Sequence, residues 1–403
     1  MAAASRRCRS LAAVPSQREP FLTAKLQGFG TTIFAEMSAL ALATDSINLG
    51  QGFPDTDAPR EILDAAIAGI NGGLNQYPPG PGMPVLRQAI AAHQQRFYGL
   101  TYDPDREVLV TVGATEALAG ALLGMLDTGD EVVVFDPMFD SYAPCIALAG
   151  AVPKPVLLRP PEYAFDPDEL RAAITAKTKL ILVNTPHNPT GRVFTMEEMQ
   201  CIADLAIEHD LVVVTDEVYE HLVFDGAQHI AMASLPGMRE RTLSISSGGK
   251  TFNTTGWKVG WLCGPAPLVQ AARTAKQFLT YVAGGPFQPA IALGLGLPDS
   301  FFHGIATDLQ AKRDRLLPGL VQAGFTVYPT SGTYFVTVDI RPLQPDGDGM
   351  AFCRALPGHC RVVAIPNEVL YANKAAGRHL VRFAFCKRLD VLDEAVARLR
   401  TLG

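Results

Sequence analysis

Six short apolar runs recur between residues 107 and 264, and each is apolar at both odd and even positions. They are EVLVT (107–111), EVVVF (131–135), KLILVN (179–184), LVVVTDE (211–217), TLSISS (242–247) and GWLCG (260–264). A strand that is apolar on both faces is typical of a sheet covered by helices on both sides. The runs therefore predict one large, buried sheet.

Segments with helical periodicity separate most of these runs. Two of them are TEALAGALLGML (115–126) and TMEEMQCIADLAIEHD (195–210), and the second opens with Thr195 and Glu198, a capping box. Strands that alternate with helices predict an α/β fold with a mostly parallel sheet. The last two runs lie too close together for a crossover helix, so we expect them to be antiparallel neighbours.

The pattern changes after about residue 300. A charged helical segment (308–324) is followed by three strand-like runs, GFTVYP, GTYFVTVD and HLVRFAF, and by a helical segment at the end of the chain (390–402). This order predicts a separate, smaller α+β unit. The segment PLQPDGDG (342–349) is typical of a surface loop.

Composition narrows the function classes. The chain has 403 residues, 48% of them hydrophobic, and a formal net charge of −6, which argues against a nucleic-acid partner. Its longest apolar runs, such as ALAGALLGML (117–126), are too short to cross a bilayer, so we expect no membrane partner. None of the seven cysteines forms a CxxC pair, which indicates a reduced, cytoplasmic protein without structural zinc, and no metal ligands are predicted.

The first 20 residues differ from the rest, with four arginines, one glutamate and no long apolar segment. This composition is not that of a secretory signal. We expect a disordered extension or an upstream start codon assigned in error, and a transit-like leader stays open as an alternative.

The stretch SSGGKTFNTTGWKVGW (246–261) holds two lysines, Lys250 and Lys258, among small residues. A phosphate loop of the GxxxxGK[ST] type would need glycine at 244, where Ser244 stands, and a helix after the lysine. Lys250 suits a nucleophilic amine better, because a partly desolvated ammonium loses its proton more easily. Ser247 and Lys258 would then be free to bind a phosphate.

Four other stretches place polar groups at strand ends or in strands. They are Gly113-Ala114-Thr115 at a helix start, Asn188 in NTPHNPTG, Asp216 with Tyr219 in DEVYE, and Arg382 in HLVRFAF. A helix start binds anions, a strand-end carboxylate suits a pyridinium nitrogen, and a buried arginine suits a carboxylate. Each has a structural alternative: a helix cap for Asp216, a salt bridge for Arg382, and a simple turn residue for the neighbouring His187.

The motifs GKTFNTTGWKVGW, NTPHNPTG, NLGQGFPD and NQYPPGPG, taken in their order, resemble those of the class I and II aminotransferases of fold type I, which use pyridoxal 5′-phosphate. The resemblance runs from about Phe21 to the end of the chain. It is strongest to the branch that holds N-succinyldiaminopimelate aminotransferases and kynurenine/glutamine aminotransferases. It implies a large domain (56–299) around a mostly parallel seven-stranded sheet, and a small α+β domain (21–55 and 300–403).

The resemblance also implies residue roles. Lys250 would bind the cofactor aldehyde and later move a proton, Asp216 would hold the ring nitrogen protonated, and Tyr219 and Asn188 would bind the ring hydroxyl. The remaining positions implied are Gly113, Ala114, Thr115, Ser247 and Lys258 for the phosphate, Phe139 for ring stacking, Tyr77 for the phosphate of a partner subunit, and Arg382, Gly52 and Phe34 for the substrate. A homodimer with shared active sites follows, as do cis peptide bonds before Pro137 and Pro189.

The implied reaction moves an amino group between an L-amino acid and a 2-oxo acid, with glutamate and 2-oxoglutarate as one pair. Small residues at VAGGP (282–286) suggest a roomy pocket, which favours N-succinyl-LL-2,6-diaminopimelate and lysine biosynthesis; ordinary loop variation is the alternative. A kynurenine-, glutamine- or methionine-type aminotransferase with cysteine-conjugate β-lyase side activity stays open. A transcription regulator on the same fold is disfavoured, because the 20 residues before the core do not resemble a helix-turn-helix.

Overall fold

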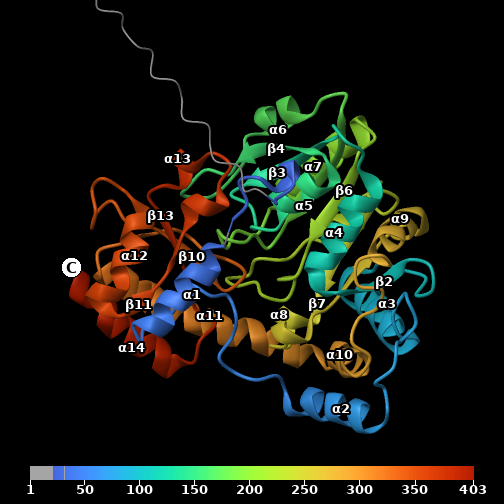
Figure 1. Ribbon diagram of the computed structural model, residues 1–403, viewed down its shortest axis with the longest axis horizontal. Helices are drawn as coiled ribbons and strands as arrows, with labels where there is room; N and C mark the ends of the chain where they lie inside the picture. Colours follow the sequence, from blue (N-terminus) through green and yellow to red (C-terminus); the bar gives the residue numbers. More distant parts are fainter. Residues whose placement is uncertain (1–20, 31) are drawn as a thin grey trace, which may run out of the picture.

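The computed structural model describes residues 21–30 and 32–403, so the expectations for the first 20 residues lie outside the described part. Within that part, no helix is both long and apolar enough to cross a membrane. The chain folds around one large sheet, and a second group of smaller sheets lies beside it (Figure 1).

The large sheet has seven strands. In spatial order they are β2 (Val108–Val112), β8 (Val259–Cys263), β7 (Thr242–Ser247), β6 (Val212–Asp216), β5 (Thr178–Asn184), β3 (Glu131–Asp136) and β4 (Val152–Leu157). β8 is antiparallel to both of its neighbours, and the other pairings are parallel. The predicted α/β fold and the antiparallel pair of β7 and β8 are confirmed.

Helices cover both faces of this sheet, as the two-sided apolar runs predicted. Buried side chains of α4 (Gly113–Met125), α5 (Tyr142–Ala149) and α9 (Ala266–Lys276) pack on one face. The other face packs against α6 (Pro167–Ala173), α7 (Met196–Glu208), α2 (Arg60–Asn71), α3 (Pro84–Tyr98) and α10 (Phe287–Leu295). The capping box of α7 is confirmed: the Glu198 N–H donates to the Thr195 hydroxyl, and the Thr195 N–H donates to the Glu198 carboxylate.

Strand β4, with the sequence VPKPVL, was not among the predicted runs. It lies at the edge of the sheet, where only β3 pairs with it. The N–H groups of Val152 and Leu158 donate to β3 or its flanking residues, so the alternate residues Pro153 and Pro155 face the open edge. Proline is tolerated there because it has no N–H to leave unpaired, and it protects the edge from pairing with other chains.

The smaller part joins the two ends of the described chain. Its strands are β1 (Ile47–Asn48) with β11 (Val362–Val363), and the sheet of β12 (Ile365–Pro366), β13 (Leu380–Ala384), β10 (Phe335–Asp339) and β9 (Thr326–Val327). Its helices are α1 (Ile33–Ala43), α11 (Asp299–Gln322), α12 (Gly349–Cys360), α13 (Lys374–Gly377) and α14 (Leu389–Leu399). The blue α1 and the orange and red C-terminal elements pack side by side around one apolar core (Figure 1).

We propose domain boundaries at residues 55 and 300. The core of the smaller part draws its side chains from α1, β1 and the elements from α11 onward, together with the segment 218–224 that follows β6. That shared segment also carries Tyr219, so the two parts meet at the pocket described next.

Candidate active site

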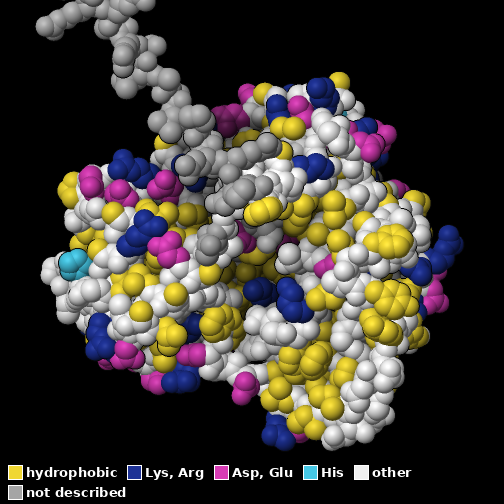
Figure 2. All heavy atoms as spheres, viewed as in Figure 1, with side chains coloured by type: hydrophobic (Ala, Val, Ile, Leu, Met, Phe, Trp, Pro, Cys, Tyr) yellow, Lys and Arg dark blue, Asp and Glu magenta, His cyan; other side chains and the backbone are white. Residues whose placement is uncertain are grey.

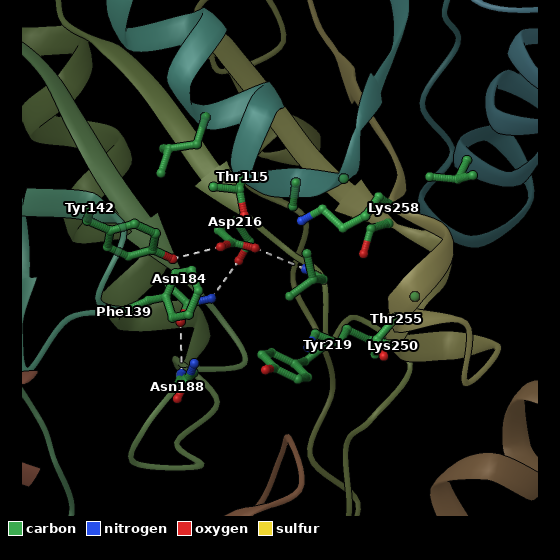
Figure 3. A pocket seen from close by; sticks show the side chains of 17 residues that line it. Thr115, Phe139, Tyr142, Asn184, Asn188, Asp216, Tyr219, Lys250, Thr255 and Lys258 are labelled. Atoms are coloured by element: carbon green, nitrogen blue, oxygen red, sulfur yellow. Dashed lines mark hydrogen bonds between the residues drawn. The ribbon is translucent and has the colours of Figure 1, made fainter. Parts of the chain in front are cut away.

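A pocket opens at the C-terminal ends of the parallel strands β5, β6 and β7, where open α/β sheets bind ligands (Figure 3). On the face shown in Figure 2 the surface is hollowed near the middle, and Lys or Arg side chains lie in the hollow. The pocket is lined by Gly113, Ala114, Thr115, Leu118, Phe139, Tyr142, Asn184, Asn188, Asp216, Val218, Tyr219, Ser247, Gly249, Lys250, Thr255, Lys258 and Val259.

Asp216 ends β6 directly beside Asn184, which ends β5 and is its register partner. The Tyr142 hydroxyl donates to Asp216 Oδ2 at 2.8 Å, and the Val218 N–H donates to Oδ1 at 3.3 Å (Figure 3). Burial raises the pKa of the Asp216 carboxyl, while these hydrogen bonds and the charge of Lys250 act against the rise. A buried carboxylate with no ion-pair partner among the described residues suits a cationic ligand group.

Lys250 lies in the single helical turn α8 (Gly248–Thr251), which directly follows β7. Burial lowers the pKa of its ammonium to about 8, and the charges of Arg382 and Lys258 add to the effect. The turn packs closely: a Cβ at Gly248 would lie 2.7 Å from Ile291 Cδ1. The Lys250 Nζ is therefore held in the pocket with a sizeable fraction as the neutral, nucleophilic amine near neutral pH.

The first turn of α4 forms an anion site with Lys258. Gly113 begins the helix with a φ of +71°, and a Cβ there would lie 3.0 Å from Lys258 Nζ. Thr115 and Lys258 lie at the same end of the pocket (Figure 3), and Ser247 also lines the pocket. Such a set of donors fits a phosphate.

Arg382 lies in β13 and is buried, with 2% of its surface exposed. It does not form the structural salt bridge that the sequence left open as an alternative. Its Nη1 donates to Asn188 Oδ1 at 2.9 Å, and its Nη2 donates to the Gly50 carbonyl at 3.0 Å. In the described part of the chain no carboxylate lies within salt-bridge distance of it, and its Nε has no partner. Burial lowers the pKa of the guanidinium to about 10, so it stays charged at neutral pH and can receive a carboxylate.

The other predicted substrate residues surround this guanidinium. The Arg382 Cζ lies 5.2 Å from the centre of the Phe34 ring, and the Gly52 carbonyl accepts a hydrogen bond from Tyr334 at 2.6 Å. Tyr77 does not line the pocket of its own chain: it is 82% exposed and packs edge-to-face on Tyr281. The structure thus brings together every predicted site residue except Tyr77.

Sequence reasoning missed Tyr142, Asn184, Thr255 and Tyr334. Tyr142 begins α5 three residues after Phe139 in DPMFDSY, and that helical spacing was the one available signal. Asn184 ends a run that was assigned to the sheet alone, yet its Nδ2 donates to the Asp216 carbonyl and its Oδ1 accepts from the Asn188 N–H. No spacing rule points to Tyr334 of the smaller part, whose ring centre lies 5.7 Å from Lys250 Nζ and 5.3 Å from the centre of the Tyr219 ring.

Three secondary expectations have clear outcomes. His187 is a turn residue: its ring is buried, its Nδ1 contacts the Thr190 hydroxyl, and burial lowers its pKa to about 3. The peptide bonds before Pro137 and Pro189 are cis, as expected. Turns, rather than a helix, follow Asp216, so it caps no helix.

The roomy pocket predicted from VAGGP (282–286) stays a prediction. None of residues 282–286 is among the described residues that line the pocket of the same chain. The small side chains serve close packing, because a Cβ at Gly285 would lie 2.6 Å from the Leu74 carbonyl oxygen and one at Gly284 would lie 2.9 Å from the Phe287 ring. Close packing within the chain is therefore one reason for glycine at these two positions.

Comparison with known proteins extends this picture. The family model "Aminotransferase class I and II" matches residues 44–399. A probable N-succinyldiaminopimelate aminotransferase, DapC of Mycobacterium tuberculosis, is 52% identical over 94% of this chain and 98% of its own length. A methionine aminotransferase of Escherichia coli is 39% identical over 94% of this chain and 97% of its own length. The solved N-succinyldiaminopimelate aminotransferase of Mycobacterium tuberculosis superposes with a TM-score of 0.92 at 51% identity, over 95% of this chain and 100% of that one.

Proposed function

We propose a specific reaction for this chain, which belongs to the class I and II aminotransferases and uses pyridoxal 5′-phosphate. The proposed substrates are N-succinyl-LL-2,6-diaminopimelate and its 2-oxo acid, with glutamate and 2-oxoglutarate as the second pair. The observation that carries the proposal is the 52% identity to a relative of that name over 94% of the chain. The proposed place of the reaction is lysine biosynthesis.

The residues around the pocket fit the cofactor at each of its groups. When bound, the cofactor supplies an aldehyde that takes up an amine and a pyridinium ring that withdraws electrons from the substrate Cα. In our proposal Asp216 keeps the proton on the ring nitrogen, Phe139 stacks on the ring, and Asn188 and Tyr219 bind the ring hydroxyl. The phosphate is bound by Gly113, Ala114, Thr115, Ser247 and Lys258.

In the proposed reaction Lys250 transfers the proton and Arg382 binds the substrate. Lys250 Nζ would hold the aldehyde carbon when no substrate is present. As a free amine it would take the proton from the substrate Cα and deliver it to the cofactor carbon that carried the aldehyde. Its lowered pKa supports this role, because a general base acts best with a pKa near the working pH. Arg382 binds the α-carboxylate beside the backbone at Gly52, with Phe34 against the side chain, which sets the Cα–H bond perpendicular to the ring.

We further propose a cytoplasmic homodimer with shared sites, in which Tyr77 binds the phosphate of the partner subunit. Its exposure of 82%, next to the exposed ring of Tyr281, supports a surface that another subunit covers. All six cysteines in the described part are unpaired, which supports a reducing compartment.

The substrate proposal is tested by measuring kcat/KM of the holoenzyme for a panel of amino donors with 2-oxoglutarate as acceptor. The panel is N-succinyl-LL-diaminopimelate, methionine, kynurenine and glutamine. We expect the diaminopimelate derivative to exceed each of the others by about 100-fold or more, in line with a site that binds its polar groups. Equal or faster turnover of methionine or kynurenine would overturn the proposal.

A methionine-type aminotransferase is the second candidate, and the 39% identity to the Escherichia coli enzyme favours it. The same panel decides between the two. Adding a cysteine S-conjugate and measuring pyruvate release tests the β-lyase side activity, for which the pocket would use the same residues.

A further inference from the structure

A buried cluster of histidines and carboxylates lies outside the pocket. His93 projects from α3, and Glu220 and His221 follow the pocket residue Tyr219 in the segment after β6. His93 and Glu220 are buried, and His221 is partly exposed. We call these three residues the buried histidine cluster.

The ligand atoms of the cluster converge. His93 Nε2 and His221 Nε2 form a hydrogen bond of 2.8 Å, whose proton a metal ion would replace. One ring nitrogen of each histidine and one Glu220 carboxylate oxygen all lie within 4.8 Å of one another. The Tyr98 hydroxyl donates to Glu220 Oε2 at 2.5 Å, and the Ser246 hydroxyl donates to Oε1 at 2.6 Å. Each oxygen keeps a second lone pair, so these donors orient the carboxylate without using up its capacity.

The charges of the cluster are not balanced by its own residues. Glu220 and Glu217 are both buried, and no Lys or Arg of the described chain lies within salt-bridge distance of either. The arginine whose charge reaches both histidines, Arg96, is itself paired with Asp299. Two buried carboxylates without a cation are costly, so a positive charge is expected here.

A second sign of a missing partner is the third histidine, His229. Its side chain is 3% exposed, its Nε2 lies 3.4 Å from Glu217 Oε2, and neither ring nitrogen has a hydrogen-bond partner. His93 Nδ1 has no partner either. Buried polar atoms in native proteins are normally satisfied by protein, water or an ion.

We propose that His93, Glu220 and His221 bind a divalent first-row transition metal ion, for which Zn²⁺ is the probe. Two imidazoles and one carboxylate are a common ligand set for such ions, and the partly exposed side of His221 leaves a position for water and a route of entry. Cysteine spacing could not reveal this set, because its members lie 127 residues apart in sequence (93 to 220) and include no cysteine.

The metal would tie α3 to the segment that carries Asp216 and Tyr219, so its role is to position these two residues. It would not touch the reacting atoms. Its removal is expected to loosen this segment and so weaken the binding of pyridoxal 5′-phosphate.

The test is zinc analysis of the holoenzyme after incubation with Zn²⁺ and exhaustive dialysis. We expect about one zinc per chain, and a loss of at least about 10-fold in zinc affinity in His93→Gln and in Glu220→Gln. The matched control is His303→Gln, an exposed histidine on α11, which should leave the zinc content unchanged. Circular dichroism in the far ultraviolet, which does not depend on the cofactor, reports whether each variant is folded.

Should a variant fail to fold, the wild-type holoenzyme still decides. Replacing Zn²⁺ with Co²⁺ should give the visible bands of a four- or five-coordinate site with nitrogen ligands. An absence of tight zinc binding, zinc binding that survives in either variant, or a Co²⁺ spectrum of an all-water site would overturn the proposal.

Discussion

At the scale of single residues, the pocket contains ionisable groups with few partners. Asp216 accepts hydrogen bonds from the Tyr142 hydroxyl and the Val218 N–H, and Arg382 lacks any carboxylate partner in the described chain. Each of these groups is held by neutral donors or acceptors, which leaves its charge free to act on a ligand. Removing one of these neutral partners should therefore change function more than stability.

Tyr142→Phe tests this at Asp216. Loss of the hydroxyl donor should raise the pKa of the Asp216 carboxyl further, so the acid limb of the pH–kcat/KM profile should move to higher pH. A hydrogen bond to a charged group contributes about 1.5–3 kcal/mol, which predicts a fall in kcat/KM of about 10-fold or more at neutral pH. Tyr102→Phe is the matched control, because its buried hydroxyl has no partner; equal profiles for the two variants would refute the role of Tyr142.

The lowered pKa of Lys250 predicts how the rate of cofactor capture depends on pH. Burial lowers the pKa of its ammonium to about 8, and only the neutral amine attacks an aldehyde. The rate at which the apoprotein captures pyridoxal 5′-phosphate, followed by absorbance, should rise about tenfold per pH unit below this value and level off above it. A rate that keeps rising to pH 10 would show an ordinary, solvated lysine.

At the scale of elements, close packing fixes the start of α4, where we propose that the phosphate binds. Gly260 in β8 lies against the start of α4: a Cβ there would be 2.4 Å from the Gly113 carbonyl carbon and 2.6 Å from the Ala114 nitrogen. Backbone atoms cannot swing aside as a flexible side chain can. The position of the helix start therefore depends on the absence of a side chain in the neighbouring strand.

Gly260→Ala should displace the first turn of α4. Overpacking of this kind costs about 1–3 kcal/mol, so the dissociation constant for pyridoxal 5′-phosphate should rise by about 10-fold. Titration of the apoprotein measures it. Gly304→Ala in α11, where a Cβ would meet nothing within 4 Å, is the control, and unchanged cofactor affinity in Gly260→Ala would contradict the account.

The strands and the pocket also show which features could be predicted from the sequence. The apolar runs predicted six of the seven strands because their two-sided burial leaves a strong signal, whereas VPKPVL carries the opposite signal and is a strand only because an edge tolerates its prolines. The pocket positions around Lys250 followed from motifs. Tyr334 and the buried histidine cluster could not, because they depend on contacts between residues more than 80 positions apart.

At the scale of the whole molecule, the pocket of one chain is expected to be completed by another. Tyr77 is exposed, lies outside the pocket of its own chain, and is assigned to the partner's phosphate site. A role across an interface can be separated from a role within the chain by mixing subunits.

A hybrid of a Lys250→Ala subunit and a Tyr77→Phe subunit makes this separation. One site of the hybrid would combine the native Lys250 of one subunit with the native Tyr77 of the other, so its activity should reach half-saturation at the wild-type concentration of pyridoxal 5′-phosphate. The Tyr77→Phe homodimer should need more cofactor. If the hybrid keeps the weak affinity of that parent, Tyr77 does not act on the partner's site.

The central claim is that Lys250 is the residue that binds the cofactor covalently and that Lys258 binds only its phosphate. The most direct measurement is borohydride reduction of the holoenzyme, which makes the lysine–cofactor bond permanent, followed by proteolysis and mass-spectrometric mapping of the labelled peptide. The account predicts a label on Lys250 alone, and no label in Lys250→Ala. A label on Lys258, or the same labelling in Lys250→Ala, would contradict it.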